Sequence, residues 1–215
     1  MLVRRHAQDP TVIDDCSFHP CVRYNRYERD SVISFVPPDG NFELMRYRAT
    51  NMSQLITPPI TCNPSITFGD AATKNQGRVN LHLSMKPTSS LVFPAGKGPM
   101  TLEDVVVTLS LPTCVTSASL TATHGSTLYD ESTRTLTWTL SKLTQSHRTT
   151  LSGPITSASN APRPVVKPIE IRWKCPMASV SGLAVSGLSV MNEGYKPYKG
   201  VRTVTKSGTF CVRVE

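Results

Sequence analysis

Strict alternation of apolar and polar residues is the dominant pattern along this chain. Between Val79 and Met85 every second residue is apolar. Alternation recurs in 102–111, 135–140 and 169–175, and three further short stretches, 183–190, 201–205 and 209–214, complete the set of predicted strands. Because successive side chains of a strand point to opposite faces, each stretch predicts a strand with one buried face. Ser207-Gly208 is predicted to turn the last two into a hairpin. Such strands, divided by turn residues, indicate an all-β antiparallel sandwich.

The stretch 31–48, SVISFVPPDGNFELMRYR, predicts a further β-hairpin. Residues 32–36 are an apolar run rich in β-branched and aromatic side chains, which favours a strand. A Pro-Asp-Gly turn at 38–40 follows, since proline presets φ, aspartate bonds its own backbone and glycine tolerates positive φ. Phe42 and Leu44 then alternate with polar residues, as in a half-buried strand. On these residues alone, the stretch is one hairpin of a sandwich.

The composition is typical of a folded protein with an anionic partner. Of 215 residues 39% are hydrophobic, and 23 lysines and arginines against 15 acids give a formal net charge of +8. This surplus indicates membrane lipid, nucleic acid or acidic peptide as partner, without choosing among them. No apolar run approaches the roughly 20 residues that span a bilayer, and the first residues lack the apolar core of a secretory signal. We therefore expect the six cysteines to be free thiols.

No catalytic or metal-binding signature is present in the sequence. It has no GxSxG, P-loop, GxGxxG or HExxH motif, and its five histidines are isolated, so we expect no enzyme activity. Cys16, His19 and Cys21 lie close together, but no second ligand pair follows at zinc-finger spacing. We expect neither a metal site nor a cofactor. Nucleic-acid binding is disfavoured, because most aromatic residues face into strands and are not interleaved with basic ones.

Five longer motifs, in one order along the chain, resemble a known family. They are DDCSFHPCVRY at 14–24, VISFVPPDGNFELMRYR at 32–48, LTATHGSTLYDESTRTLTWTLSKL at 120–143, SGLAVSGLSV at 181–190 and GYKPYKGVRTVTKSGTFCVRV at 194–214. The chain resembles the mu homology domain, the C-terminal part of the medium (mu) subunits of clathrin-adaptor complexes. Its last segment is most similar to medium subunits of adaptor complex 3.

This resemblance implies an elongated all-β fold of two antiparallel sandwich subdomains, one inserted in the other. Residues 1–48 and 175–215 would form the outer subdomain, and residues 49–174 the inserted one. The polar, Pro-rich stretch 152–168 predicts a loop or a boundary, in agreement with that division. The first strands of the family should precede Asp14. Nothing in MLVRRHAQDPTVID matches them, so we expect the outer subdomain to lack these strands.

The resemblance also implies a function in vesicle-mediated intracellular transport. Family members bind cytosolic tails of membrane cargo proteins that contain Tyr-x-x-Φ, where Φ is a bulky apolar residue. The tail adds as a strand to an exposed sheet edge, and two pockets bind its Tyr and Φ side chains. The protein would be cytoplasmic and peripheral on Golgi and endosomal vesicle membranes. Other adaptor-complex subunits would bind through a longin-like half that is not part of this chain.

By resemblance, the edge strand that binds the tail is 199–203. Arg202 matches the residue whose guanidinium lies against the tyrosine ring, a cation–π contact worth about 0.5–2 kcal/mol. The stem of Lys199 would cover the Φ pocket. Gly200 stands where some medium subunits have tryptophan, which reduces contact area and predicts a weaker or shifted preference. The expected peptide-binding residues are Val185, Leu188, Lys199, Gly200, Val201 and Arg202.

Two alternatives remain open. From the residues alone, Val185, Leu188 and Val201 are ordinary core residues, and Lys199 and Arg202 belong to a solvated face. The second alternative is a mu-type scaffold that has lost tyrosine-motif binding and serves as a structural or membrane-surface module. Five basic residues against two acidic ones in the last 25 positions are typical of a surface that binds acidic membrane lipids.

Overall fold

A computed structural model shows that the chain divides into two compact units. Unit 1 comprises Met1–Thr57, Ser90–Pro94 and Met177–Thr203, and unit 2 comprises Pro58–Ser89, Ala95–Pro176 and Val204–Glu215. Within these ranges the structure describes residues 2–4, 12–30, 32–50, 57–69, 73, 75–86, 99–158, 164–179, 190, 194–195, 198 and 200–214. Over this described part, no helix has the length and apolar character that crossing a bilayer requires.

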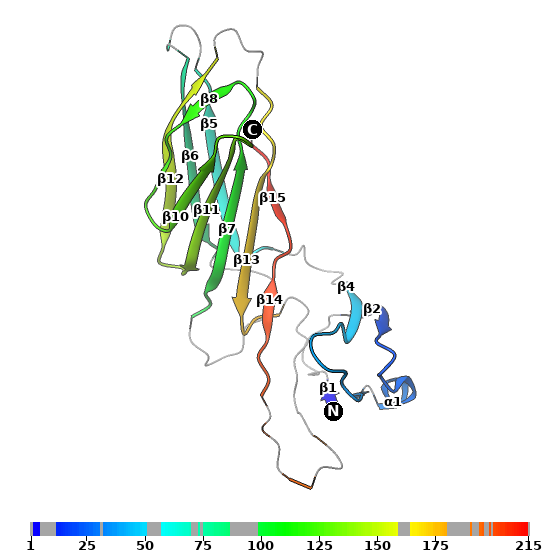
Figure 1. Ribbon diagram of the computed structural model, residues 1–215. Helices are drawn as coiled ribbons and strands as arrows, with labels where there is room; N and C mark the ends of the chain where they lie inside the picture. The colour runs from blue at the N-terminus through cyan, green and yellow to red at the C-terminus, as the bar shows by residue number, and fades with distance from the viewer. Residues whose placement is uncertain are drawn as a thin grey trace. The chain divides into compact units, whose positions relative to one another are not determined.

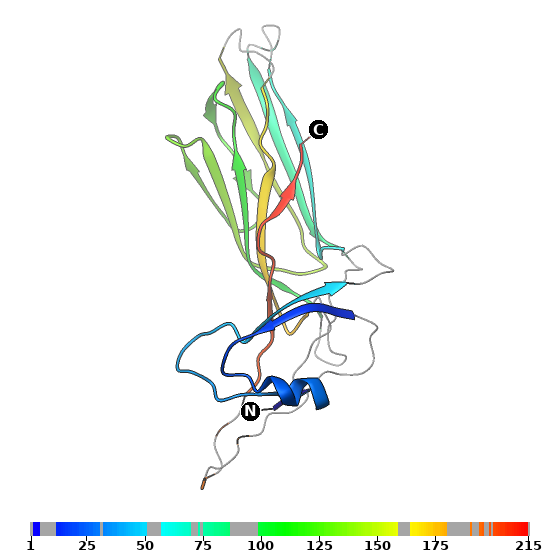
Figure 2. The ribbon, with the colours of Figure 1, turned by 90° about the vertical axis from the view of Figure 1, so that its right-hand side faces the viewer.

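Unit 2 is a sandwich of two antiparallel sheets that lie face to face (Figures 1 and 2). The six strands of the first sheet are β7 (Leu102–Ser110), β10 (Ser126–Asp130), β11 (Thr135–Leu143), β13 (Ile169–Pro176), β14 (Val204–Lys206) and β15 (Phe210–Val212). Their order is β10-β11-β7-β13, and β14 and β15 both pair with β13. The five strands of the second sheet are β5 (Ile60–Thr67), β6 (Gln76–Met85), β8 (Val115–Ala118), β9 (Thr121–Ala122) and β12 (Arg148–Ser157). Their order is β5-β6-β12, and β8 and β9 both pair with β12.

The core of unit 2 lies between the two sheets and consists of the apolar residues of the alternating stretches. Val79 and Leu81 of β6 face inward, as do Val105 of β7 and Ile171 of β13, and none of them is accessible to solvent. Trp138 of β11 is also fully buried, and its indole N–H donates to the carbonyl oxygen of His124 at 2.8 Å, so that its one polar group is bonded. The predicted all-β antiparallel sandwich is confirmed.

The prediction of a loop over 152–168 is wrong at its start. Strand β12 continues through this polar stretch to Ser157, because Ile155 faces the core and is 1% exposed. Residues 164–168 have no regular structure. The weak apolar pattern of SGPITS therefore concealed the end of a paired strand.

The predicted C-terminal hairpin is also wrong. Strands β14 and β15 do not pair with each other, because the chain continues in one direction along β13: Lys206 is opposite Lys174, and Phe210 is opposite Ile171. Three residues, 207–209, are thus opposite two, 172–173, which is the pattern of a β-bulge. Ser207 bonds to Trp173 at this bulge in both directions: its hydroxyl accepts the Trp173 N–H at 2.9 Å, and its own N–H donates to the Trp173 carbonyl at 3.1 Å.

Within the part of unit 1 that the structure describes there are four short strands and a helix. They are β1 (Leu2–Arg4), β2 (Val12–Phe18), α1 (Tyr24–Asp30), β3 (Val32–Ser34) and β4 (Met45–Thr50). β1 pairs with β3, and β2 pairs with β4, both antiparallel. The stretch MLVRRHAQDPTVID, in which no family strand could be matched, thus contains β1 and the start of β2. Neither β1 nor β2 nor α1 was predicted from the sequence.

The predicted hairpin over 31–48 is wrong in its pairing, since β3 and β4 belong to different sheets. The turn itself is correct, because Gly40 has a φ of 78°. Two consecutive prolines precede it, and they have no N–H with which to continue a ladder. The chain instead crosses between the two sheets, and Phe42 packs on the small core of Ile33 and Phe35, with an edge-on ring contact to Phe35 at 6.1 Å between centroids.

The expected division into residues 1–48 with 175–215 and residues 49–174 remains a proposal. The two compact units follow it over much of the chain but differ at the C-terminal end. Val204–Glu215 groups with unit 2, because β14 and β15 complete the edge of the β13 sheet. A subdomain boundary placed on strand pairing would therefore lie at Thr203, and not between residues 174 and 175.

Candidate peptide-binding segment

The structure describes three of the six predicted peptide-binding residues: Gly200, Val201 and Arg202. The other three, Val185, Leu188 and Lys199, lie outside the described residues. The candidate site is therefore the segment 200–203 of unit 1. It comes directly before β14 in the chain and has no regular secondary structure. The strand predicted over 201–205 begins only at Val204.

Both predicted side chains of this segment face solvent. Val201 is 50% exposed, and Arg202 is exposed as well. The alternative that Val201 is an ordinary core residue is therefore wrong. The end of the segment is held in place by a hydrogen bond from the Met177 N–H to the Thr203 carbonyl at 2.8 Å. An apolar side chain and a guanidinium are thus adjacent in the chain and accessible to a ligand.

Tyr198 is an exposed aromatic residue beside the segment that the sequence reasoning did not single out. It is 99% exposed, and Tyr195 is 70% exposed. A Cβ added at Gly200 would lie 3.6 Å from the Tyr198 ring and meet no closer neighbour, so there is space for a larger side chain at this position. Exposed tyrosines are enriched in interfaces because the ring combines a large apolar area with a hydroxyl. Two tyrosines within YKPYKGV were the available signal.

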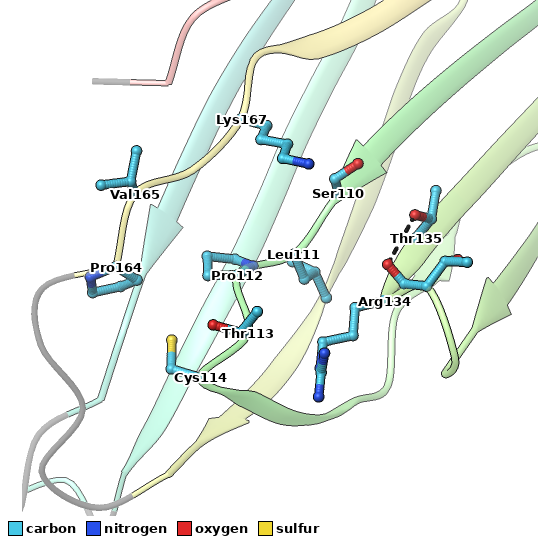
Figure 3. A pocket seen from close by; sticks show the side chains of 11 residues that line it. Ser110, Leu111, Pro112, Thr113, Cys114, Arg134, Thr135, Pro164, Val165 and Lys167 are labelled. Carbon is cyan, nitrogen blue, oxygen red and sulfur yellow. Dashed lines mark hydrogen bonds between the residues drawn. The ribbon is translucent and has the colours of Figure 1, made fainter.

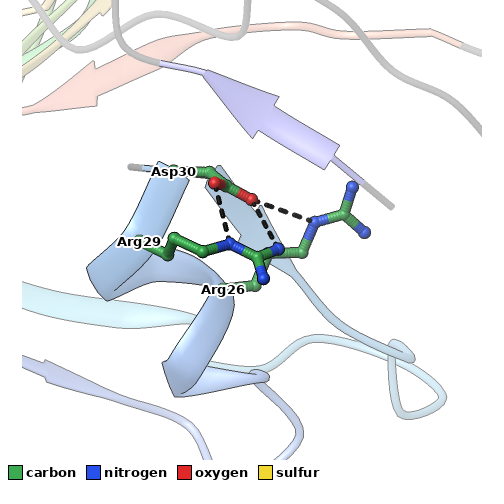
Figure 4. Close-up of polar contacts among 3 residues, drawn as sticks. All are labelled: Arg26, Arg29 and Asp30. Atoms are coloured by element: carbon green, nitrogen blue, oxygen red, sulfur yellow. Dashed lines mark hydrogen bonds and ion pairs between the residues drawn. The ribbon is translucent and has the colours of Figure 1, made fainter.

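Arg202 makes no ion pair within the part of the chain that the structure describes. The arginines of α1 differ in this respect (Figure 4). Arg29 forms two bonds to the Asp30 carboxylate, at 3.0 and 3.1 Å, and Arg26 approaches the same carboxylate at 4.0 Å. The positive charge of Arg26 and Arg29 is therefore partly neutralised by the Asp30 carboxylate. No carboxylate of the described residues pairs with the Arg202 guanidinium and so competes with a ligand.

The Cys16, His19 and Cys21 side chains take part in local packing in unit 1. The Cys16 thiol donates to the Tyr27 hydroxyl at 3.9 Å. The Nδ1 atom of His19 accepts the Cys21 N–H at 3.2 Å, and its ring contacts Phe42 edge-on. Across the described residues, no three His, Cys, Asp or Glu side chains are grouped closely enough to hold a metal ion.

A hollow of about 770 Å³ lies at one end of unit 2 (Figure 3). It is formed by the connection after β7, the turn before β11 and the segment before β13. Arg134 and Lys167 are charged residues of its lining, and Cys114 contributes a thiol. Among its described lining residues there is no histidine or carboxylate that could act as a general base for this thiol. The geometry provides a partly apolar surface hollow without the pair of groups that proton-transfer catalysis needs.

Comparison with known proteins places the chain among adaptor subunits. It is 38% identical over 206 residues to "AP-3 complex subunit mu-1" of Homo sapiens, and 36% identical to "AP-3 complex subunit mu" of Dictyostelium discoideum. Each alignment covers 95% of this chain and 46% of the relative, so the chain spans about half the length of the curated relatives it matches.

Among solved structures, the chain is similar to "Fcho1 Mu homology domain (Danio Rerio) with bound Eps15 peptide", with a TM-score of 0.47 and 15% identity over 96% of this chain and 70% of that one. A similarity this low supports no conclusion about the site. The sequence match is more specific, because residues 5–214 fit the model of the family described as "Adaptor complexes medium subunit family". The chain therefore belongs to the adaptor complexes medium subunit family.

Proposed function

We propose that the chain is the cargo-recognition domain of an adaptor-complex medium subunit, and that it binds Tyr-x-x-Φ signals in the cytosolic tails of membrane proteins. Family membership supports the class of protein. The observation that favours the peptide site is the solvent exposure of Val201 and Arg202, side by side in a segment outside any strand. An exposed apolar residue next to a guanidinium that has no ion-pair partner among the described residues is suited to an aromatic and apolar ligand.

The tail would bind first through its backbone. Among the described residues of 200–203, only the Thr203 carbonyl has a backbone hydrogen-bond partner. The remaining N–H and C=O groups can bond to an extended peptide, as in strand addition to a sheet edge. This contribution is independent of the sequence of the tail, so specificity must come from side chains.

The side chains of the segment would then select the signal. The Arg202 guanidinium can lie against the face of the tail tyrosine, a contact worth about 0.5–2 kcal/mol. Val201 would contact the Φ residue, and burial of its half-exposed side chain would favour binding by removing apolar surface from water. Gly200 contributes no side chain, so we expect moderate affinity.

Calorimetric titration of the 215-residue chain with a Tyr-x-x-Φ peptide tests this proposal, with the matching Ala-x-x-Φ peptide as control. We expect Arg202→Ala to weaken binding about 2- to 30-fold, the range that the cation–π contact predicts, and Val201→Asp to weaken it further. Arg213→Ala removes an exposed charge of unit 2 and should leave the affinity unchanged. Equal binding of the two peptides would contradict the proposal.

A second variant tests the same site by gain of affinity. Gly200→Trp adds a large aromatic side chain where, among the described residues, the nearest atoms to an added Cβ belong to the Tyr198 ring at 3.6 Å, so we expect it to bind the Tyr-x-x-Φ peptide more tightly than the parent chain. Absence of binding in both proteins would instead favour the mu-type scaffold that serves as a structural module on acidic membranes.

The cellular setting is part of the same proposal. We propose a non-catalytic, cytoplasmic protein that is peripheral on Golgi and endosomal vesicle membranes. It would contact other adaptor subunits through the part of its relatives that this chain does not span. Fractionation of cells that express the chain fused to the remainder of a medium subunit tests this, with the protein expected in the membrane pellet and released by high salt.

A further inference from the structure

The five-stranded sheet of unit 2 contains no acidic residue. None of β5, β6, β8, β9 and β12 includes Asp or Glu, whereas Arg78, His82 and Arg148 point outward from it. In the other sheet two basic residues are paired with acids: Lys174 contacts Asp104 at 2.6 Å, and Arg172 contacts Glu170 at 3.7 Å. The outer face of the five-stranded sheet thus carries basic side chains and, among the described residues of its strands, no carboxylate.

A hollow of about 690 Å³ lies on this face. Strand register explains which side chains surround it. Thr61, Ser84 and Arg148 are opposite one another across β5, β6 and β12. The next row consists of Asn63, His82 and Thr150. Since neighbouring strands are about 4.8 Å apart, the two rows form one compact set of polar side chains. Lys86 and Gln145 complete the rim.

The polar side chains that line this hollow can all donate hydrogen bonds. Arg148 offers a planar fork of donors, Lys86 an ammonium, and Asn63 and Gln145 amide N–H groups. His82 contacts the Thr150 hydroxyl through Nδ1 at 3.3 Å, and in the tautomer in which Nδ1 accepts this bond its Nε2–H is a donor. The main-chain N–H of Lys86 bonds the Pro59 carbonyl at 2.9 Å and fixes the start of that side chain. Among the described residues that line the hollow there is no carboxylate, so an anion would meet hydrogen-bond donors from them.

We propose that this hollow binds a phosphate group. Phosphate has several strong acceptor oxygens on one compact anion, and arginine with lysine is the pair that recognises it most effectively. The site belongs to unit 2 and uses none of the residues of the proposed peptide segment, so it can be correct or wrong independently of Tyr-x-x-Φ binding. The same chemistry is presented by a soluble phosphate ester and by a phosphorylated lipid headgroup.

Titration of the ¹⁵N-labelled chain with inorganic phosphate tests the site, with sodium chloride at equal ionic strength as the reference. We expect saturable shifts of amide signals within 61–63, 82–86 and 145–149. Arg148→Gln should weaken phosphate binding about tenfold or more, as expected for loss of a charge-assisted bond. Arg172→Gln removes one exposed charge from the other sheet and is the matched control. Shifts equal to those in chloride, or equal affinity of the Arg148→Gln variant, would overturn the proposal.

Vesicles distinguish the two sources of phosphate. One set contains phosphatidylinositol monophosphate and the other contains phosphatidylserine at equal total charge. Co-sedimentation with the first set alone, lost in Arg148→Gln and reversed by inorganic phosphate, would assign the site to a lipid headgroup. Phosphate binding without preference between the vesicles would assign it to a soluble phosphate ester. Binding to both sets that Arg148→Gln leaves unchanged would count against the site. An unaltered unfolding midpoint of the variant excludes loss of fold as the cause.

Discussion

At the scale of single residues, Gly153 in the middle of β12 has no space for a side chain. A Cβ there would overlap the carbonyl oxygen of Ser119 and lie 2.9 Å from the Cα of Leu120. Both are backbone atoms, and the Ser119 N–H is bonded to the Pro154 carbonyl at 3.0 Å, so they cannot yield easily. We expect Gly153→Ala to lower the free energy of unfolding by about 1–3 kcal/mol, measured by urea denaturation.

Gly194→Ala is the matched control, because a Cβ at this exposed position meets nothing within 4 Å. It should leave the urea midpoint within error of the parent protein. If both alanine variants unfolded at the same urea concentration, the close approach of the 119–120 backbone to β12 would be disproved.

Two buried thiols predict how stability depends on alkaline pH. Burial raises the pKa of Cys62 and of Cys175 to about 11, and Glu103 adds to the effect at Cys175. The folded thiols therefore keep their protons up to about pH 11, whereas unfolded thiols lose them near pH 8.5. Stability from these groups is fully present below the unfolded pKa and is lost as the pH rises toward 11, by up to about 1.4 kcal/mol per pH unit for each thiol.

Urea unfolding at pH 8, 9.5 and 10.5 measures this loss. Other groups also titrate in this range, so the parent chain is compared with the Cys62→Ala and Cys175→Ala variants. Each variant is expected to be less stable at pH 8 but to lose less stability on going to pH 10.5. Parallel pH profiles for the three proteins would show that the thiols do not contribute.

At the scale of elements, the sequence predicted strands well and their partners poorly. Val105 and Ile171 show why the strands were visible: each belongs to a stretch in which one face is buried and the other is solvated. Pairing is different, because it depends on residues far apart in the chain. The turn at Gly40 and the bulge at Ser207 both resemble hairpin turns locally, yet their flanking strands pair with β1, β2 and β13.

The bulge between β14 and β15 provides a test of its own hydrogen bonds. The Ser207 hydroxyl accepts the Trp173 N–H at 2.9 Å. Ser207→Ala leaves this donor without its partner, and we expect a loss of about 1–3 kcal/mol together with faster hydrogen exchange of the Trp173 amide. Ser207→Thr keeps the hydroxyl and should restore most of the protection. Ser141→Ala, at an exposed position of β11, is the control. Unchanged exchange in Ser207→Ala would contradict this account of the bulge.

At the scale of the whole molecule, the sites were less predictable than the fold. The resemblance singled out Val201 and Arg202 as peptide-binding residues, and that role stays a prediction, although both side chains are exposed. The phosphate hollow gave no local signal, because Asn63, His82 and Arg148 come from three strands that only the sheet register brings together. The net charge of +8 indicated an anionic partner, but a total charge does not show which face lacks acids.

The division into two units leads to a last prediction, because the aromatic residues are unevenly distributed. Trp138 and Trp173, the two tryptophans of the chain, both belong to unit 2. Each unit has buried apolar residues of its own, such as Ile33 in unit 1 and Leu151 in unit 2. We propose that the units unfold separately. Leu151→Ala should then lower the stability reported by tryptophan fluorescence by about 2–5 kcal/mol, whereas Ile33→Ala should leave that transition unchanged.

Far-ultraviolet circular dichroism of the same samples supplies the complementary measurement, because it reports on the backbone of both units. In Ile33→Ala the dichroism should show an additional unfolding transition at a lower urea concentration, which the tryptophan fluorescence lacks. In Leu151→Ala most of the change in dichroism should occur at the same urea concentration as the change in tryptophan fluorescence. A tryptophan midpoint that shifts equally in both variants would mean that the chain unfolds as one cooperative body, and the boundary at Thr203 would then have no thermodynamic meaning.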